Sequence, residues 1–296
     1  MNTSCDDKDS ASTKLALPPG LYVVATPIGN LEDITLRALR ILREVDLIAC
    51  EDTRHTQKLL NHFEIKTPTQ SYHKHNESAR AEELVQRIAG GERVALVADA
   101  GMPGISDPGE RVVRAAVERG LNVVAIPGPS ALISALVASG LPTESFRFLG
   151  FLPARSGERR GALETLRMVP ETLVFYEAPH RIVEMLGDLA TVLGSERKVV
   201  IARELTKIHE EFLRGSAANV TAELAKRGAV KGEITVIVAG KSESSAPEAL
   251  PQNLIQRMRQ LMSVDSLDEK AALKQAAKEF GISKSDAYRQ WQRGKR

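Results

Sequence analysis

The segment of this sequence best suited to ligand chemistry is ALVADAGMPGISDPG, at residues 95–109. An apolar run leads to Asp99, and the residues that follow include three glycines and two prolines, which let a backbone approach a ligand closely. The loop matches neither GxGxxG nor the phosphate-binding GK[ST] pattern, and no cationic side chain lies between Asp99 and Gly109. It therefore suits a neutral or cationic adenosine-type ligand better than a nucleotide phosphate, and S-adenosylmethionine fits that description.

Five further loops of similar character follow strand-like apolar runs. They are TPIGN (26–30), CEDTR (50–54), PGPSAL (127–132), EAPHR (177–181) and RELTK (203–207). Because the carboxyl ends of parallel strands meet at one edge of a sheet, these loops together indicate a ligand site between two domains. Structural interpretations stay open beside this one. Ser130 is a good N-cap, Asp107-Pro108 can begin a helix, and Glu51 and Asp52 can solvate a strand end.

The elements that must position these loops follow from alternating patterns. Strands are expected at 21–26, 46–50, 93–99 and 122–128, and then at 172–178, 198–204, 211–215 and 233–240. Helical patterns at 33–43, 53–62, 77–89 and 108–119 separate the first four strands. The predicted fold class is therefore α/β, with two α/β domains, a largely parallel sheet in the first, and a helical C-terminal domain.

Composition divides the chain into six parts. We expect a disordered tail at 1–17, a first domain at 18–140, a crossing segment at 141–152, a second domain at 153–240, a linker at 241–249 and a basic helical domain at 250–296. The net charge of +2 is uneven. From Pro251 onward ten basic residues face five acidic ones, which leaves this tail at about +5 and the remainder at about −3.

Several classes of protein are disfavoured. The 296 residues include two cysteines, Cys5 and Cys50, without metal-ligand spacing, so we expect no metal. The sequence has no apolar run of about 18 residues, which disfavours a membrane span. The N-terminus is polar and acidic, unlike a signal peptide, so we expect a cytoplasmic protein.

Longer motifs carry a family resemblance. These motifs are VVATPIGNLEDITLRAL (23–39), EDTRHTQKLL (51–60), DAGMPGISDPG (99–109), PGPSALISALVASGLP (127–142), FYEAPHRI (175–182), RELTKIHEE (203–211) and GEITVIV (232–238). From about Leu21 to Gly240 the chain resembles the tetrapyrrole-methylase superfamily, and within it the branch that acts on ribosomal RNA. LKQAAKEFGISKSDAYRQW (273–291) in the basic tail resembles a helix-turn-helix, with Ala277 and Gly281 at the spacing of the tight turn.

The resemblance implies two α/β domains with a cofactor cleft between them, and a homodimer. It also implies methyl transfer from S-adenosylmethionine to the ribose 2′-oxygen of a cytidine in the decoding region of 16S ribosomal RNA, within the small ribosomal subunit. The cofactor contacts that it implies are Ile28, Ala100, Gly101, Met102, Ile105, Ser130, Ala131, Tyr176, Glu177, Leu205 and Ile234.

A ribose hydroxyl loses its proton well above neutral pH, so a base is expected to help. The candidates for the base are Glu51, Asp52, Glu177, His180, Glu204 and Glu210. Spacing does not choose among them, and we favour Glu177 and His180, with Arg181 and Lys207 as phosphate or oxyanion partners. For RNA contacts we expect Arg54 and the polar stretch Tyr72, His73, Lys74 and His75, although a solvated loop explains that stretch nearly as well.

Two alternative functions remain open. In the first, the enzyme methylates a tetrapyrrole precursor on carbon, but the TPIGN loop and the basic tail count against it. In the second, the chain is a non-enzymatic regulator that binds nucleic acid through its helix-turn-helix and senses a metabolite with its α/β body. Lys284, Ser285, Tyr288 and Arg289, on the second helix of that motif, suit either role.

Overall fold

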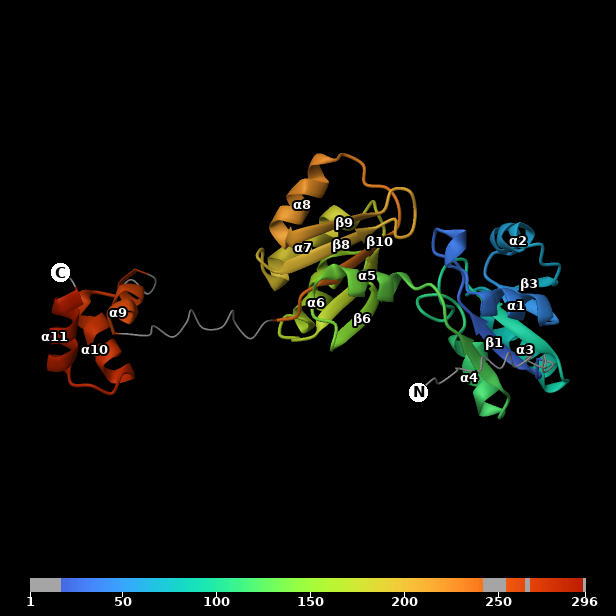
Figure 1. The fold of residues 1–296 in the computed structure, drawn as a ribbon, viewed down its shortest axis with the longest axis horizontal. Helices are drawn as coiled ribbons and strands as arrows, with labels where there is room; N and C mark the ends of the chain where they lie inside the picture. The colour runs from blue at the N-terminus through green and yellow to red at the C-terminus, as the bar shows by residue number, and fades with distance from the viewer. Residues whose placement is uncertain (1–16, 242–253, 264–266, 295–296) are drawn as a thin grey trace, which may run out of the picture. The chain divides into compact units, whose positions relative to one another are not determined.

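The computed structural model describes residues 17–241, 254–263 and 267–294 (Figure 1). These residues form two compact units, Met1–Gly240 and Lys241–Arg296, which we describe separately. The expected tail at 1–17 and linker at 241–249 lie almost entirely outside the described residues.

The first sheet is entirely parallel, as the alternating pattern predicts. Its strands are β1 (Gly20–Val24), β2 (Leu47–Cys50), β3 (Thr69–Ser71), β4 (Arg93–Val97) and β5 (Val123–Ile126), in the order β3-β2-β4-β1-β5. We did not predict β3, because its sequence Thr-Gln-Ser has no apolar run and it pairs at the sheet edge. The carboxyl ends of all five strands therefore lie along one edge of this sheet.

Helices cover both faces of the first sheet. They are α1 (Leu36–Glu44), α2 (Thr53–His62), α3 (Glu77–Ala89) and α4 (Glu110–Glu118), and a 3-10 helix η1 (Leu31–Asp33) precedes α1. Side chains of α1 and α2 pack with one set of alternating strand residues, and those of α3 and α4 pack with the other set. Alternate side chains of a strand point to opposite faces, so the central strands β1, β2 and β4 are buried on both faces and almost entirely apolar.

The second sheet is mixed rather than parallel. Its strands are β6 (Phe146–Phe151), β7 (Thr172–Glu177), β8 (Lys198–Arg203), β9 (Glu211–Ser216) and β10 (Ile234–Val238), in the order β6-β7-β10-β8-β9. Strand β10 runs antiparallel to both neighbours, so β7 and β8 point the same way. In the register, Ile234 lies between Glu177 and Arg203. The carboxyl ends of β7 and β8 therefore meet the amino end of β10 at one edge.

Two elements correct our domain boundaries. The expected crossing segment at 141–152 contains a strand, β6, which pairs with β7. Helix α5 (Ala131–Ser139), which we assigned to the first domain, packs its buried side chains against Val174, Val200 and Ile237 of the second sheet. The apolar face of α5 thus packs with the second sheet, although the helix follows β5 of the first sheet along the chain.

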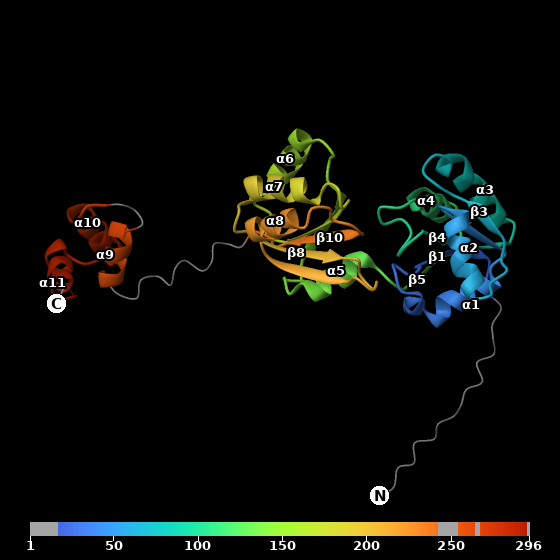
Figure 2. The same ribbon diagram turned by 90° about the horizontal axis from the view of Figure 1, so that it is seen from above.

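Three helices cover the opposite face of the second sheet. They are α6 (Ser156–Thr165), α7 (Ile182–Leu193) and α8 (Ala217–Lys226). Figure 2 shows them on one side of β8 and β10, with α5 on the other. Their buried side chains join Phe175, Ile201 and Val236 in the largest apolar cluster of the described residues.

The described residues of the C-terminal unit form three helices, in agreement with the helical pattern of the tail. They are α9 (Leu254–Ser263), α10 (Glu269–Glu279) and α11 (Lys284–Gly294). Met258, Ala277, Ala287 and Trp291 lie in their shared core. Gly281 has a φ of 62° in the turn between α10 and α11, so the helix-turn-helix spacing is confirmed.

Candidate functional site

A cavity of about 330 Å³ lies where the loops of the two sheets meet. Its lining contains all eleven residues that the resemblance implied as cofactor contacts: Ile28, Ala100, Gly101, Met102, Ile105, Ser130, Ala131, Tyr176, Glu177, Leu205 and Ile234. None of the described residues that line it is a lysine or an arginine. The structure therefore brings these positions together in an apolar site with acidic groups and without a phosphate-binding cation.

The glycine-rich loop is joined to the first loop by its backbone. The amide of Gly101 donates to the carbonyl of Thr26 at 3.0 Å, and the amide of Thr26 donates to the carbonyl of Gly101 at 3.0 Å. Gly101 has a φ of 80°, and a Cβ added there would lie 3.3 Å from Cγ2 of Ile28. Its backbone groups are thus committed to Thr26, and what Gly101 provides is a left-handed conformation and open space.

A strained loop of the second sheet contacts the first loop. Glu204 and Thr206 have φ values of 51° and 65°, which are rare for residues with a side chain. The hydroxyl of Thr206 accepts from the amide of Asn30 at 3.1 Å. A Cβ on Gly29 would lie 2.4 Å from Cγ of Lys207, so this contact requires glycine at residue 29. These two strained residues therefore lie where the loops of the two sheets meet.

Glu177 ends β7 in the cavity wall with its side chain fully buried. Its Oε1 accepts from the amide of Ala178 at 2.8 Å and lies 3.4 Å from Nε of Arg181, whereas its Oε2 is buried without a partner. Nη2 of Arg181 donates to the carbonyls of Leu152 and Pro153 at 2.9 and 3.0 Å. Arg181, which we predicted to hold a phosphate, therefore points inward and joins the wall to the segment after β6.

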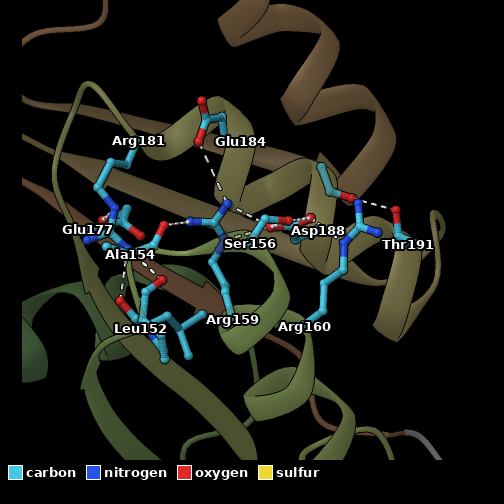
Figure 3. Close-up of polar contacts among 12 residues, drawn as sticks. Leu152, Ala154, Ser156, Arg159, Arg160, Glu177, Arg181, Glu184, Asp188 and Thr191 are labelled. Atoms are coloured by element: carbon cyan, nitrogen blue, oxygen red, sulfur yellow. Dashed lines mark hydrogen bonds and ion pairs between the residues drawn. The ribbon is translucent and has the colours of Figure 1, made fainter.

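A second arginine holds the same segment (Figure 3). Arg159, whose side chain is 1% exposed, donates to the carbonyl of Ala154 at 3.1 Å and to Asp188 at 2.7 Å. Ser156 and Arg160 also donate to Asp188. Burial alone would raise the pKa of Asp188, but these donors outweigh it and hold the pKa below its ordinary value. Ion pairs and hydrogen bonds of buried charged groups therefore hold this wall of the cavity in place.

Lys207 lies in a neighbouring cavity of about 320 Å³ that shares Ile28, Ala100 and Glu233 with the first. Its Nζ donates to Glu204 at 2.8 Å and to Glu233 at 3.2 Å. The hydrogen bond from Lys207 is the main cause that lowers the pKa of Glu204, which makes that carboxylate a weak base. His180 is exposed and does not line either cavity.

The remaining base candidates differ sharply in environment. A hydrogen bond from Arg54 lowers the pKa of Asp52 to about 2. Glu210 accepts from the amide of Thr206 at 2.6 Å. Burial, followed by the charge of Asp99, raises the pKa of Glu51. The environment of Glu51 thus makes it a stronger base, and that of Asp52 makes it a weaker one.

A second acid with a raised pKa is Asp107, which the sequence also allows to begin a helix. Asp107 lines the main cavity, and burial together with the charges of Glu51 and Asp99 raises its pKa to about 6. The carboxyl group of Asp107 has no hydrogen bond or ion pair with any described residue. The sequence signal that could have identified Asp107 as a site residue is its position in the glycine-rich loop after β4.

The predicted RNA contacts lie along the first sheet's edge. Arg54 is 88% exposed and lines a shallow surface groove with Lys58. Lys74 and His75 are exposed, and the rings of His73 and His75 are 5.9 Å apart. Tyr72 corrects our expectation of a stacking side chain, because it is 1% exposed and its hydroxyl donates to Glu77.

Sequence reasoning missed several residues of the cavity. They are Ser106, Asp107, Phe151, Ala178, Pro179, Ala202, Gly232, Glu233 and Thr235. Gly232, Glu233 and Thr235 lie at the amino end of β10, and a search restricted to the carboxyl ends of strands does not find them. The motif GEITVIV contained them, but their placement depends on the antiparallel direction of β10.

Neither a metal centre nor a membrane-spanning helix is found in the described part of the chain. No three or more His, Cys, Asp or Glu side chains there are grouped to hold an ion. None of the helices described is both long and apolar enough to cross a bilayer.

Comparisons with known proteins give consistent matches. The family model for tetrapyrrole (corrin/porphyrin) methylases matches residues 20–221. Ribosomal RNA small subunit methyltransferase I of Halalkalibacterium halodurans is 48% identical over 270 residues, covering 90% of this chain and 93% of that protein. The protein of the same name from Synechocystis is 46% identical over 268 residues, covering 90% and 95%.

A solved structure of low sequence identity shares the fold. Uroporphyrin-III C-methyl transferase from Thermus thermophilus, complexed with S-adenyl homocysteine, superposes with a TM-score of 0.52 at 20% identity. The match covers 74% of this chain and 97% of that one.

Proposed function

Because the chain belongs to the tetrapyrrole methylase family, we propose that it transfers a methyl group from S-adenosylmethionine to ribosomal RNA. The acceptor is the ribose 2′-oxygen of a cytidine in the decoding region of 16S ribosomal RNA. The observation that carries this proposal is the identity of 46–48% to two ribosomal RNA small subunit methyltransferases I over 90% of the chain.

The cavity suits S-adenosylmethionine. Its volume of about 330 Å³ lies in the range of small-molecule sites. Glu177 and Glu233 place negative charge in the lining, which favours a positively charged sulfur over a phosphate. The buried, unpartnered Oε2 of Glu177 is an acceptor for a hydrogen-bond donor of the ligand. The S-adenyl homocysteine complex of the Thermus thermophilus enzyme supports the same cofactor.

The chain's own residues contribute position and charge. When bound, S-adenosylmethionine supplies an electrophilic methyl group on a positively charged sulfur. The ends of β7, β8 and β10 hold that ligand at one side, and the Gly101 loop encloses it from the other. Holding the ribose oxygen in line with the methyl group contributes up to roughly 7–11 kcal/mol in ideal cases. Removal of the hydroxyl proton by a positioned base contributes a further factor of about 10² to 10⁴.

RNA contacts involve two regions in this proposal. Lys74 and His75 are exposed after β3, on the side of the first sheet where Asp107 lies. In the C-terminal unit, Tyr288 and Arg289 are exposed on α11. Cationic side chains bind RNA phosphates, and exposed tyrosine and histidine rings stack on unpaired bases.

We further propose a homodimer that acts on the small ribosomal subunit in the cytoplasm. Exposed apolar side chains occur on α5, where Ile133 and Val137 are 46% and 66% exposed, and on β6, where Phe146 and Leu149 are 38% and 37% exposed. An exposed apolar surface of this kind supports association between two copies. Light scattering of Val137→Glu tests this part, and a dimer with unchanged stability would contradict the proposed interface.

Transfer of label tests the reaction itself. The purified protein is incubated with methyl-labelled S-adenosylmethionine and small ribosomal subunits from a strain that lacks the modification. We expect label in 16S ribosomal RNA at a ribose 2′-oxygen. Label in a porphyrin precursor would favour the tetrapyrrole alternative, and absence of label with retained nucleic-acid binding would favour the regulator.

Deletion of residues 250–296 tests the role of the basic tail. We expect cofactor affinity to be preserved and affinity for the small subunit to fall. That affinity should also depend less on salt concentration. Each phosphate contact releases counterions on binding, and the truncated chain makes fewer such contacts. Equal affinity and an equal salt slope in the truncated chain would assign the tail a structural role instead.

A further inference from the structure

We propose that Asp107, with Glu51 beside it, is the base that accepts the proton of the methylated hydroxyl. The inference rests on the proposed function and names a residue that performs its proton transfer. Asp107 combines three features that the other candidates do not share: it lines the cavity, its carboxyl group is without a partner among the described residues, and its loop is fixed on both sides.

The loop around Asp107 restricts where its carboxyl group can lie. Ser106 has a φ of 66°, a strained value for a residue with a side chain, and Pro108 fixes the backbone on the other side. The next amide, that of Gly109, donates to Oε1 of Glu77 at 3.3 Å. A base must be held near its proton donor, and this backbone provides that restraint.

The charges that face Asp107 come from several elements. Glu51 follows β2, and Asp99 precedes the glycine-rich loop; both raise the pKa of Asp107, after burial as the largest cause. Lys74, after β3, lowers it. Tyr176 of the second sheet faces it as well: burial raises the pKa of this phenol, and the charge of Asp107 adds to that rise. A carboxylate with a pKa of about 6 is ionised at neutral pH and is a stronger base than an ordinary aspartate.

The position of Asp107 also fits the path of the substrate. Lys74 and His73, two predicted RNA contacts, act electrostatically on Glu51, and Lys74 acts on Asp107 too. The two acids thus lie within electrostatic reach of these groups, while Asp107 lines the predicted cofactor cavity. In this proposal RNA binds at His73 and Lys74, and its ribose hydroxyl lies next to Asp107 when it approaches the methyl group.

The step balances within the proposed reaction. The ribose oxygen forms a bond to the methyl carbon while the carbon–sulfur bond breaks, and that electron pair remains on the sulfur. The hydroxyl proton moves to a carboxylate oxygen of Asp107, which later releases it to solvent. No oxidant or additional reactant is required.

Single-turnover rates between pH 5 and 9, with saturating cofactor and unmodified small subunits, test the proposal. For the wild-type protein we expect the rate to rise with pH to a plateau, with a midpoint near 6. Asp107→Asn should lower the plateau rate by about 10² or more while cofactor affinity, measured by calorimetry, changes little. Glu51→Gln should keep most of the rate and move the midpoint to lower pH, since removal of a nearby negative charge lowers the pKa of Asp107.

Glu110→Gln is the matched control. Glu110 lies in the first turn of α4, three residues after Asp107, and its side chain is 79% exposed and paired with Arg114. This variant should keep the wild-type rate and midpoint. A wild-type rate and pH profile in Asp107→Asn would overturn the assignment of the base, and an unmoved midpoint in Glu51→Gln would overturn the pairing. If the wild-type protein transfers no label to RNA, the proposed function fails instead.

Discussion

Acidic side chains in and near the lining of the cavity have opposite environments on its two sides. On the second-sheet side, Glu177 is paired with Arg181, and Glu204 with Lys207. On the first-sheet side, Asp107 and Glu51 have no hydrogen bond or ion pair with described residues, and burial raises the pKa of each. Paired charges hold the second-sheet wall in place, whereas unpaired, desolvated acids on the first-sheet side are available for proton transfer.

This difference is the reason that we propose Asp107 as the base, whereas the sequence favours Glu177 and His180. Glu177 is ion-paired with Arg181, while His180 is exposed and lies outside the cavity. In both walls the acid follows a strand, so position along the chain does not distinguish them. What distinguishes the acids is the set of neighbours that each one has in the folded protein.

Removal of Arg159 should have the largest effect on the second-sheet wall. Arg159→Ala leaves the carboxylate of Asp188 buried with one partner fewer, and we expect the free energy of unfolding to fall by about 3–5 kcal/mol in urea titrations. Arg160→Ala is the matched control, because Arg160 contacts the same carboxylate but is 53% exposed, and it should lose less than about 1 kcal/mol. Equal losses of stability in the two variants would show that burial of the arginine does not determine how much it contributes to stability.

Gly101→Val should act on the first-sheet wall by filling space. A branched side chain at a φ of 80°, next to Ile28 in the lining, should weaken cofactor binding about a hundredfold or more, which corresponds to about 2.7 kcal/mol. Gly104→Val is matched in strain, with a φ of 82° in the same loop, but Gly104 does not line the cavity. Calorimetry should find near-normal affinity in that control. Similar losses in both variants would attribute the effect to backbone strain.

Arg181→Ala separates a positioning role from a catalytic one. Loss of its hydrogen bonds to the carbonyls of Leu152 and Pro153, and of its charge beside Glu177, should lower stability by about 1–3 kcal/mol. The single-turnover rate at saturating cofactor should fall less than about tenfold. The double variant with Glu177→Gln should recover part of the stability, because a neutral amide needs no counter-charge. A rate loss of about a hundredfold with normal stability would return this residue to the catalytic set.

Of these variants, Asp107→Asn should change the free energy of unfolding least, and it should stabilise the fold. The pKa of Asp107 is about 6 in the folded chain and lower when unfolded, so ionisation disfavours folding. The wild-type protein therefore loses stability relative to the variant as pH rises from about 4 to 6, and the difference is constant above that range. Because Asp107 is half-buried, we expect about 1 kcal/mol, or a Tm higher by about 2–4 °C at pH 7. If the difference in Tm between the variant and the wild-type protein is the same at pH 5 and pH 7, Asp107 is not an unpaired acid.

The sequence by itself determined the elements and the identity of the loops. Apolar runs and helical patterns located most strands of both sheets, and the family resemblance of the motifs implied all eleven cofactor positions that the cavity brings together. These signals are local, because strand and helix periodicity and glycine-rich turns are written in consecutive residues. The helix-turn-helix of the C-terminal unit is local in the same sense.

Only the tertiary structure decided the direction of β10, the partner of α5 and the state of each acid. The antiparallel pairing of β10 brings Gly232 and Glu233 to the cavity, and α5 packs on the second sheet although it follows β5 of the first. Whether an aspartate caps a helix or acts as a base depends on burial and on charges distant in sequence, as Glu51 and Lys74 are from Asp107. Such contacts leave no periodic pattern in the chain, so they are known only once it is folded.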